Sequence, residues 1–387
     1  MITFLRGQNF SGRSKWMEDR RGTGFYPKFV LVNHSVDTTY TGLTWTVREE
    51  LQLVSENSDY GRAVETFGLK DFLDRELHVL SGGESVRTAL AVAVLHSPDE
   101  IQIDCALEQV DDTWRNKILD FFHKDKSNQS LVIADNHLIN DSIGTIKDFP
   151  ITNTMQTVWS RFSAENALSY VQKITSAPIS IKNLSFRYKS SENKVFDDIN
   201  YNFLPGNLYF FVGANGSGKT TLVKLLAGAL TPQIGDIFYA GKKFNPRISN
   251  SRYASLAFQN PDYQWVTNTV EKEIDRLRKM GQKDKLNFLE AFGIDRVFLK
   301  MSPIELPFVV KKRVSVGLAA LSGKQWLILD EPTLGQDELY RNNFANFVKS
   351  VLKMQVGIIV ISHDSSFRKL FPEAKTVIFK DRTIATE

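Results

Sequence analysis

The sequence predicts an α/β fold built on a parallel sheet, and it predicts this fold twice along the chain. Three observations carry the prediction. A glycine-rich loop, 213–220, lies between an apolar run and a helical pattern. Two further apolar runs, 327–329 and 357–361, each end in polar or acidic residues, as parallel strands with a site at their carboxyl ends do. Similar segments recur 226 positions earlier.

The bulk composition is that of a folded protein. The chain has 387 residues, of which 42% are hydrophobic and 24% charged, which predicts two domains rather than a disordered chain. Its net charge of +4 is small for this length and does not by itself favour a nucleic-acid partner. We interpret the densest basic run, 311–313, as the solvated start of a helix rather than as a phosphate-binding patch.

Cysteine content and hydropathy restrict the location. Cys105 is the single cysteine, which excludes an intramolecular disulfide and a zinc site built on several cysteines. A reducing, cytoplasmic compartment fits this composition. The sequence has no apolar run of about 18 residues, and its first six residues become polar too soon for a signal peptide. Any role at a membrane is therefore expected to be peripheral.

The loop 213–220 matches the phosphate-binding pattern G-x-x-x-x-G-K-[ST] at every fixed position. Its glycines let backbone N–H groups curl around phosphate oxygens, and the following helix adds positive potential. Lys219 is expected to reach the terminal phosphates, and Thr220 to ligate Mg²⁺. The strand before the loop and the helix after it favour a phosphate site over a chance glycine turn. The predicted phosphate-binding residues are Gly213, Asn215, Gly216, Ser217, Gly218, Lys219, Thr220 and Thr221.

An acidic pair completes the predicted site. Asp330 and Glu331 directly follow the apolar run 327–329, and His363 follows the run 357–361. Asp330 is suited to hold Mg²⁺, and Glu331 can polarise a water molecule. Because the carboxyl ends of parallel strands meet at one edge of a sheet, these side chains and the loop are expected to share one nucleotide site.

An internal repeat organises the chain. Asp104 ends an apolar run in the same frame as Asp330, 226 positions earlier. Ser81 precedes Asp104 by 23 residues, and Pro307 precedes Asp330 by the same interval. Matching intervals of this kind indicate two copies of one unit rather than a coincidence of composition.

With these motifs in this order, the chain resembles the ATP-binding cassette (ABC) family, as two P-loop NTPase cassettes fused in tandem at 1–160 and 178–387. The resemblance covers nearly the whole chain. In the second cassette the matching residues are Tyr188 for adenine stacking, Gln259 of the Q-loop, Asp330 and Glu331 of Walker B, Asp337 of the D-loop and the switch residue His363. In the first they are Ser81, Gly82, Gly83 and Glu84 of the signature LSGGE, and Asp111 of the D-loop.

The motif losses of the two cassettes interlock. Cassettes of this family pair head to tail, with each ATP between one phosphate loop and the other signature. The first phosphate loop, expected at 7–14, has Arg13 for lysine and Phe10 for a glycine, and neither is an equivalent group. The second signature, expected at 306–310, lacks the glycines and the serine. One complete composite site is therefore expected, from the second phosphate loop and the first signature.

The first cassette is expected to be degenerate in other ways. It is predicted to be truncated, without the N-terminal β-subdomain that carries the adenine-stacking aromatic. Cys105 stands where the catalytic glutamate is expected, Asn136 where the histidine is expected, and Asn33 or His34 where the glutamine is expected. The resemblance leaves two interpretations of this site. It is either a closed site that binds nucleotide through Arg13 or a structural hinge without a ligand. The absence of the adenine-stacking aromatic favours the hinge.

At the complete site the resemblance implies ATP hydrolysis by in-line attack of water. Tyr188 would stack on adenine, and Thr220, Gln259 and Asp330 would surround Mg²⁺. Glu331 would position or deprotonate the water and His363 would contact the γ-phosphate, while Ser81, Gly82 and Gly83 close over it. The predicted catalytic residues are Glu331, His363, Gln259 and Lys219.

A more specific resemblance indicates which kind of protein this ATPase works with. The segment 259–273 is similar to the Q-loop segment of ATPases from energy-coupling factor importers, which take up vitamins and metal ions. It implies an ATPase on the inner face of the cell membrane that drives an integral membrane subunit, with a substrate-binding membrane subunit as a further partner and no direct nucleic-acid contact. The alternatives are a soluble ABC ATPase of translation or nucleic-acid metabolism and a non-hydrolysing scaffold. The join at 140–178 has no long charged run, and Lys219, Asp330, Glu331 and His363 are intact, which disfavours both.

Overall fold

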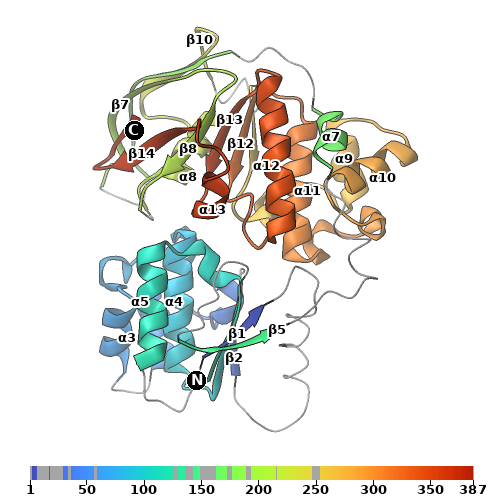
Figure 1. The fold of residues 1–387 in the computed structure, drawn as a ribbon. Coiled ribbons are helices and arrows are strands. Elements are labelled where there is room, and N and C mark those ends of the chain that lie inside the picture. The colour runs from blue at the N-terminus through green and yellow to red at the C-terminus, as the bar shows by residue number, and fades with distance from the viewer. Residues whose placement is uncertain are drawn as a thin grey trace. The chain divides into compact units, whose positions relative to one another are not determined.

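The computed structural model describes residues 2–6, 17, 29–33, 36–55, 59–124, 130–135, 143–148, 163–171, 177–188, 193–214, 216–245 and 253–386. The chain divides into two compact units, Met1–Met155 and Gln156–Glu387, called here the first and second unit (Figure 1). The cassette bounds at 160 and 178 stay a prediction, because most of the join lies outside the described residues.

The first unit is built on a parallel sheet with the strand order β2-β3-β4-β1-β5. The strand bounds are Phe29–Asn33 for β2, Glu100–Asp104 for β3, Ser130–Ala134 for β4, Ile2–Arg6 for β1 and Thr145–Asp148 for β5. The central strands β3 and β4 are largely buried on both faces, with Glu100 and Gln102 of β3 among the buried residues, as in a parallel sheet covered by helices.

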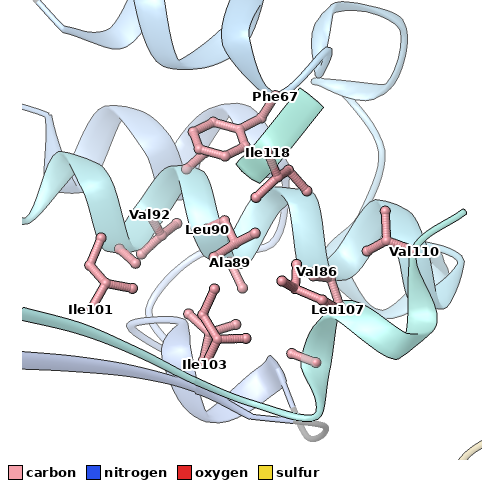
Figure 2. Close-up of a cluster of buried hydrophobic side chains, with 14 of the residues drawn as sticks. Phe67, Val86, Ala89, Leu90, Val92, Ile101, Ile103, Leu107, Val110 and Ile118 are labelled. Atoms are coloured by element: carbon pink, nitrogen blue, oxygen red, sulfur yellow. The ribbon is translucent and has the colours of Figure 1, made fainter. Parts of the chain in front are cut away.

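Helices and short 3-10 turns cover this sheet. The helices are α2 Val47–Val54, α3 Tyr60–Thr66, α4 Gly82–Leu95 and α5 Asp112–Lys124, and the turns are η1 Val36–Thr39, η2 Lys70–Phe72, η3 Leu77–Val79 and η4 Ala106–Gln109. Figure 1 shows α4 and α5 side by side. Figure 2 shows Val86, Ala89 and Leu90 of α4 directed toward Ile101 and Ile103 of β3, so α4 forms the centre of the core.

The second unit contains two sheets. The larger has the order β11-β12-β13-β8-β14-β15, parallel except for β15. Its bounds are Ala254–Ala257, Trp326–Asp330, Gly357–Ile361, Leu208–Val212, Lys375–Lys380 and Thr383–Thr386 in that order. The smaller is antiparallel, with the order β10-β9-β6-β7 and the bounds Lys242–Lys243, Ile234–Tyr239, Ile179–Phe186 and Phe196–Phe203. No counterpart of this smaller sheet occurs among the described residues of the first unit.

The helices of the second unit follow the same plan as those of the first. They are α7 Ala164–Leu168, α8 Lys219–Leu226, α9 Val270–Leu277, α10 Gln282–Ala291, α11 Phe308–Leu321, α12 Glu338–Lys353 and α13 Ser365–Arg368. The 3-10 turns are η5 Pro261–Gln264, η6 Arg296–Lys300 and η7 Pro303–Glu305.

The two units share one topology. The order β2-β3-β4-β1-β5 corresponds strand for strand to β11-β12-β13-β8-β14. Cys105 and Glu331, which follow β3 and β12, both have a positive φ, 56° and 48°. Each also donates its backbone N–H to the end of the next strand, at 2.7 Å to Ala134 O and 2.9 Å to Ile361 O. The repeat predicted from the sequence intervals is therefore present in the backbone.

One buried arginine recurs in both units. Arg87 of α4 lies over the Trp114 ring, with 4.3 Å from Cζ to the ring centroid, and donates to the Gly68 carbonyl at 3.2 Å. Arg313 of α11 lies 4.4 Å from the centroid of Tyr340 and donates to the Gly293 carbonyl at 2.6 Å. This pair establishes that α4 and α11 are equivalent helices.

The interpretation of 311–313 as a solvated helix start is wrong. Lys311, Lys312 and Arg313 are all buried. Their charged groups reach acceptors inside the unit; Lys311, for example, forms a 2.8 Å ion pair with Asp262. Long cationic side chains can be buried when hydrogen bonds satisfy the head group, and the charge density of a sequence does not reveal such partners.

We predict that Gly357→Ala destabilises the second unit. A Cβ at Gly357 would lie 2.5 Å from the Trp326 ring, which is fully buried and fixed by a 2.7 Å hydrogen bond from its Nε1 to Ala177 O. Overpacking of this kind typically costs about 1–3 kcal/mol. The measurement is urea unfolding followed by circular dichroism.

Gly61→Ala is the matched control. An added Cβ at Gly61, in α3, has no heavy atom within 4 Å. This change should raise stability by about 0.5–1 kcal/mol, because alanine favours a helix over glycine. Equal stability of wild type and Gly357→Ala would contradict the packing of Trp326.

Candidate nucleotide site

The phosphate loop connects β8 to α8 and requires glycine at two points. Gly213 and Gly218 have φ values of 155° and 102°, which non-glycine residues rarely adopt. A Cβ at Gly213 would lie 2.6 Å from the Phe379 carbonyl oxygen, and one at Gly218 would lie 2.8 Å from the Phe196 ring. The loop therefore keeps its backbone close to the sheet and leads directly into the N-terminus of α8. Asn215 lies outside the described residues.

Two side chains of this loop are arranged for phosphate. The Lys219 ammonium folds back over the loop and donates to the carbonyls of Gly213 at 2.7 Å and Ala214 at 3.0 Å. The Ser217 hydroxyl oxygen is buried and has no hydrogen-bond partner among the described residues. A buried hydroxyl without a partner beside a helix N-terminus and a lysine fits an anionic ligand.

Thr220 and Asp330 fit a magnesium ion. The Thr220 hydroxyl donates to Asp330 Oδ2 at 3.1 Å, which joins the first turn of α8 to the end of β12. Asp330 Oδ1 is buried and accepts no hydrogen bond from the described residues. Mg²⁺ prefers oxygen ligands and usually keeps waters and substrate phosphates, so one carboxylate and one hydroxyl suit it better than a closed protein cage.

Glu331 and His363 meet because β12 and β13 are neighbours. The Glu331 carboxylate accepts the backbone N–H of His363 at 3.1 and 3.2 Å, and His363 Nε2 lies 3.8 Å from Glu331 Oε1. Burial, followed by the nearby Asp330 charge, raises the pKa of Glu331 to about 8. Burial also raises the pKa of Asp330. A bound cation would favour the ionised form of both carboxylates.

Lys312 is a site residue that the sequence analysis missed. Its Nζ donates to the carbonyls of Phe258 at 3.1 Å, Gln259 at 3.2 Å and Asp330 at 2.9 Å, and its side chain is 1% exposed. Burial lowers the pKa of Lys312 to about 8, against the opposing charges of Asp330 and Glu331. The only sequence signal is its place in the basic run 311–313.

Tyr188 and Gln259 lie on segments that follow strands. Tyr188 comes two residues after β6, and its hydroxyl lies 3.0 Å from the Thr221 hydroxyl. Its ring packs edge-on against Phe186, and the residue remains 38% exposed, which leaves it accessible for stacking. Gln259 follows β11 and is partly buried beside Asp330, through their shared contact with Lys312.

The predicted residues of the first unit form two helix caps. Ser81 and Glu84 make a capping box at the start of α4, since the Glu84 carboxylate accepts Ser81 N–H at 2.8 Å and the Ser81 hydroxyl accepts Glu84 N–H at 3.4 Å. Gly82 and Gly83 form the first turn of α4. Asp111 accepts a 2.9 Å hydrogen bond from Trp114 N–H before α5. In the second unit, Pro307 stands at the N-cap position of α11 without a side-chain hydrogen bond.

The strand register in the two sheets shows which residue of the first unit is equivalent to Gln259. Val32 pairs with Ile103 in the first unit, and Ala257 pairs with Leu329 in the second. Counted from these pairs, His34 rather than Asn33 is equivalent to Gln259. His34, the degenerate loop 7–14 with Arg13, and Asn136 lie outside the described residues.

Comparison with known proteins identifies the family. The family model described as ABC transporter matches residues 196–334. The energy-coupling factor transporter ATP-binding protein EcfA1 of Mycoplasmopsis pulmonis is 32% identical over 48% of this chain and 74% of its own length. The chain belongs to the ABC transporter family. The predicted α/β P-loop cassette fold is confirmed, as is the prediction that the protein binds ATP with Mg²⁺ and hydrolyses it.

Other similarities cover part of the chain or the whole of it. The energy-coupling factor transporter ATP-binding protein EcfA2 of Mycoplasma genitalium is 32% identical to this ABC ATPase over 48% of the chain and 66% of its own length. The structure titled "Model of ribosome-bound archaeal Pelota and ABCE1" covers the whole chain and 74% of its own, with a TM-score of 0.69 and 19% identity, which shows likeness of fold. In the described part of the chain, no helix has the length and apolar character needed to cross a membrane.

We predict that Glu331→Gln slows ATP turnover by about 10²–10⁴-fold, because a positioned base contributes about this factor. The amide keeps an oxygen that can accept the His363 N–H but takes up no proton, so ATP binding should change little. The measurements are steady-state ATPase kinetics and titration with a fluorescent nucleotide. Glu338→Gln, the same change on the exposed first turn of α12, should keep wild-type turnover. Ordinary turnover by Glu331→Gln would remove Glu331 from the mechanism.

Proposed function

We propose that this ABC ATPase powers a membrane transporter, of the energy-coupling factor type that imports a vitamin or metal ion, through one complete composite ATP site. The observation that carries the ATPase part of the proposal is the arrangement at the carboxyl edge of the larger sheet. There the Thr220 hydroxyl contacts Asp330, and the next residue, Glu331, contacts His363, beside the glycine loop.

Each residue at this edge has a chemical task in the proposed reaction. Tyr188 offers its ring to adenine, and Lys219 leaves its loop carbonyls for the phosphates. Mg²⁺, held by Thr220, Asp330 and Gln259, would neutralise developing charge on the phosphates. Glu331, fixed by the His363 N–H, positions or deprotonates the attacking water. His363 then contacts the γ-phosphate.

In the proposed composite site, the signature of a first unit supplies further hydrogen-bond donors to the phosphates. The capping box holds Ser81 at the start of α4, where its hydroxyl donates to Glu84 Oε2 at 2.8 Å. The backbone N–H groups of this helix N-terminus suit a γ-phosphate, and the Ser81 hydroxyl would turn from Glu84 to donate to it. The equivalent turn of α11 begins with Pro307, Phe308 and Val309 and offers neither the hydroxyl nor the glycine backbone. We infer that the intact signature serves the intact phosphate loop.

Exposed apolar side chains support a membrane partner. Tyr263 and Val266, in the segment after Gln259, are each 70% exposed. In the first unit, Leu43 is 80% exposed and Trp45 is 75% exposed, just before α2. Exposed apolar side chains gathered after the same strand in both units are typical of interaction sites.

Both of these segments are held by a buried carboxylate. Glu273 of α9 accepts the backbone N–H groups of Val266 at 2.6 Å and Thr267 at 2.5 Å. Glu50 of α2 accepts the Thr41 N–H at 2.5 Å and the Thr41 hydroxyl at 2.8 Å. Both glutamates are fully buried. The exposed apolar side chains therefore project from fixed loops.

A soluble ABC ATPase of translation or nucleic-acid metabolism is the second candidate. The whole-chain likeness of fold is to structures titled for ribosome-bound ABCE1 and RNase-L inhibitor. At 19% and 18% identity this likeness concerns the fold, whereas the relatives at 32% identity are named as energy-coupling factor ATPases. The transporter proposal rests on those relatives and on the exposed apolar segments.

We predict that Ser81→Arg lowers ATP turnover by at least about tenfold, because a bulky cation would block the γ-phosphate face of the composite site. The measurement is steady-state ATPase activity of the full chain, with thermal melting to confirm folding. Pro307→Arg places the same side chain at the equivalent position of the degenerate signature and should leave turnover unchanged. Wild-type turnover in Ser81→Arg would refute the composite site while leaving the second unit's own site intact.

We predict that this chain co-purifies in stoichiometric amount with an integral membrane protein from detergent-solubilised membranes of its source cell. Mass spectrometry of the captured partner provides the measurement. The double variant Tyr263→Asp, Val266→Asp should lose the partner and keep its basal ATPase activity. Recovery of ribosomes or nucleic acid, with no membrane protein, would favour the soluble alternative.

A further inference from the structure

Lys312 connects the ends of two neighbouring strands of the larger sheet, β11 and β12, at the nucleotide site. Its three N–H donors are used by three backbone carbonyls, those of Phe258 and Gln259 after β11 and of Asp330 at the end of β12. An ammonium group has three donors, so its hydrogen-bonding capacity is filled. One rigid contact thus fixes the backbone at both Gln259 and Asp330.

The first unit provides an internal comparison. The Arg87 and Arg313 contacts show that α4 and α11 are equivalent, and the residue before Arg87 is Val86 where the second unit has Lys312. Val86 is fully buried in the apolar core (Figure 2). The first unit therefore forms the same sheet and the same helix without this lysine.

The first unit lacks both the lysine and the predicted catalytic carboxylate. Where the second unit has Glu331, the first has Cys105, with the same positive φ and the same backbone hydrogen bond. Asp104 remains in the position of Asp330. The shared arginine serves the fold of both units, whereas the lysine occurs only in the unit that keeps the acidic pair and the glycine loop.

We propose that Lys312 is a positioning residue that sets the separation of the magnesium ligands Gln259 and Asp330 by holding their backbone carbonyls. The proposal rests on the ATP site described above. Without the ammonium, three buried carbonyls lose a donor and two buried carboxylates lose the nearest compensating charge, so this edge of the sheet would rearrange. Outer partners of metal ligands typically change metal affinity by about 10–100-fold when removed.

The test measures metal affinity apart from turnover. Full-length Lys312→Met and Lys312→Arg are titrated with Mn²⁺ in the presence of a non-hydrolysable ATP analogue, and free Mn²⁺ is followed by electron paramagnetic resonance. We expect the Mn²⁺ dissociation constant to rise about 10–100-fold in Lys312→Met and by less in Lys312→Arg, which keeps the charge. Binding of a fluorescent nucleotide in EDTA should stay within about twofold of wild type.

The matched control is Lys311→Met on the same helix. Lys311 pairs with Asp262, which is not a proposed ligand, so its loss should change Mn²⁺ affinity by less than about twofold. If Lys312→Met fails to fold, Lys312→Gln replaces it, since the amide keeps two N–H donors. Unchanged Mn²⁺ affinity in the folded Lys312 variants, or an equal loss of nucleotide binding with and without metal, would overturn the proposal. Normal turnover in Glu331→Gln would instead refute the catalytic assignment, independently of Lys312.

Discussion

A buried group of charges at the end of β12 constrains the second unit. Asp330 and Glu331 are adjacent, both are excluded from water, and the Lys312 ammonium lies against the backbone of the first. Burying two adjacent carboxyl groups is unfavourable unless hydrogen bonds and an opposite charge compensate them. The Thr220 hydroxyl, the His363 N–H and Lys312 supply this compensation from three different elements, so α8, β13 and α11 must all be in place around β12.

The first unit has the same topology but lacks the glutamate and the lysine of this group. Cys105 and Val86 replace the glutamate and the lysine, and both are buried. The backbone turn after the strand is unchanged, because the positive φ and the hydrogen bond to Ala134 belong to the fold rather than to the chemistry. What the first unit retains is the capped N-terminus of α4, about one turn before Val86.

The sequence predicted those parts of the site that follow from strand order and local patterns. Asp330, Glu331 and His363 could be placed together because parallel strands end at one edge, and Ser81 with Glu84 was named through the resemblance of LSGGE to the ABC signature. Lys312 could not be found in this way. Helical spacing places it on a helix, but only the packing of α11 against β11 and β12 turns its side chain toward three carbonyls. A basic run is usually solvated, so its local character pointed in the wrong direction.

The carboxylates of Glu50 and Glu273 have a mechanical consequence. Each holds the loop in front of its own helix by hydrogen bonds to backbone N–H groups, so Leu43 and Val266 stand on loops that are already ordered before any partner arrives. A protein that docked on them would lose little loop entropy, and its affinity would depend mainly on how well its surface fits. If a docked partner displaces such a stiff loop, the helix that follows the loop, α2 or α9, moves with it.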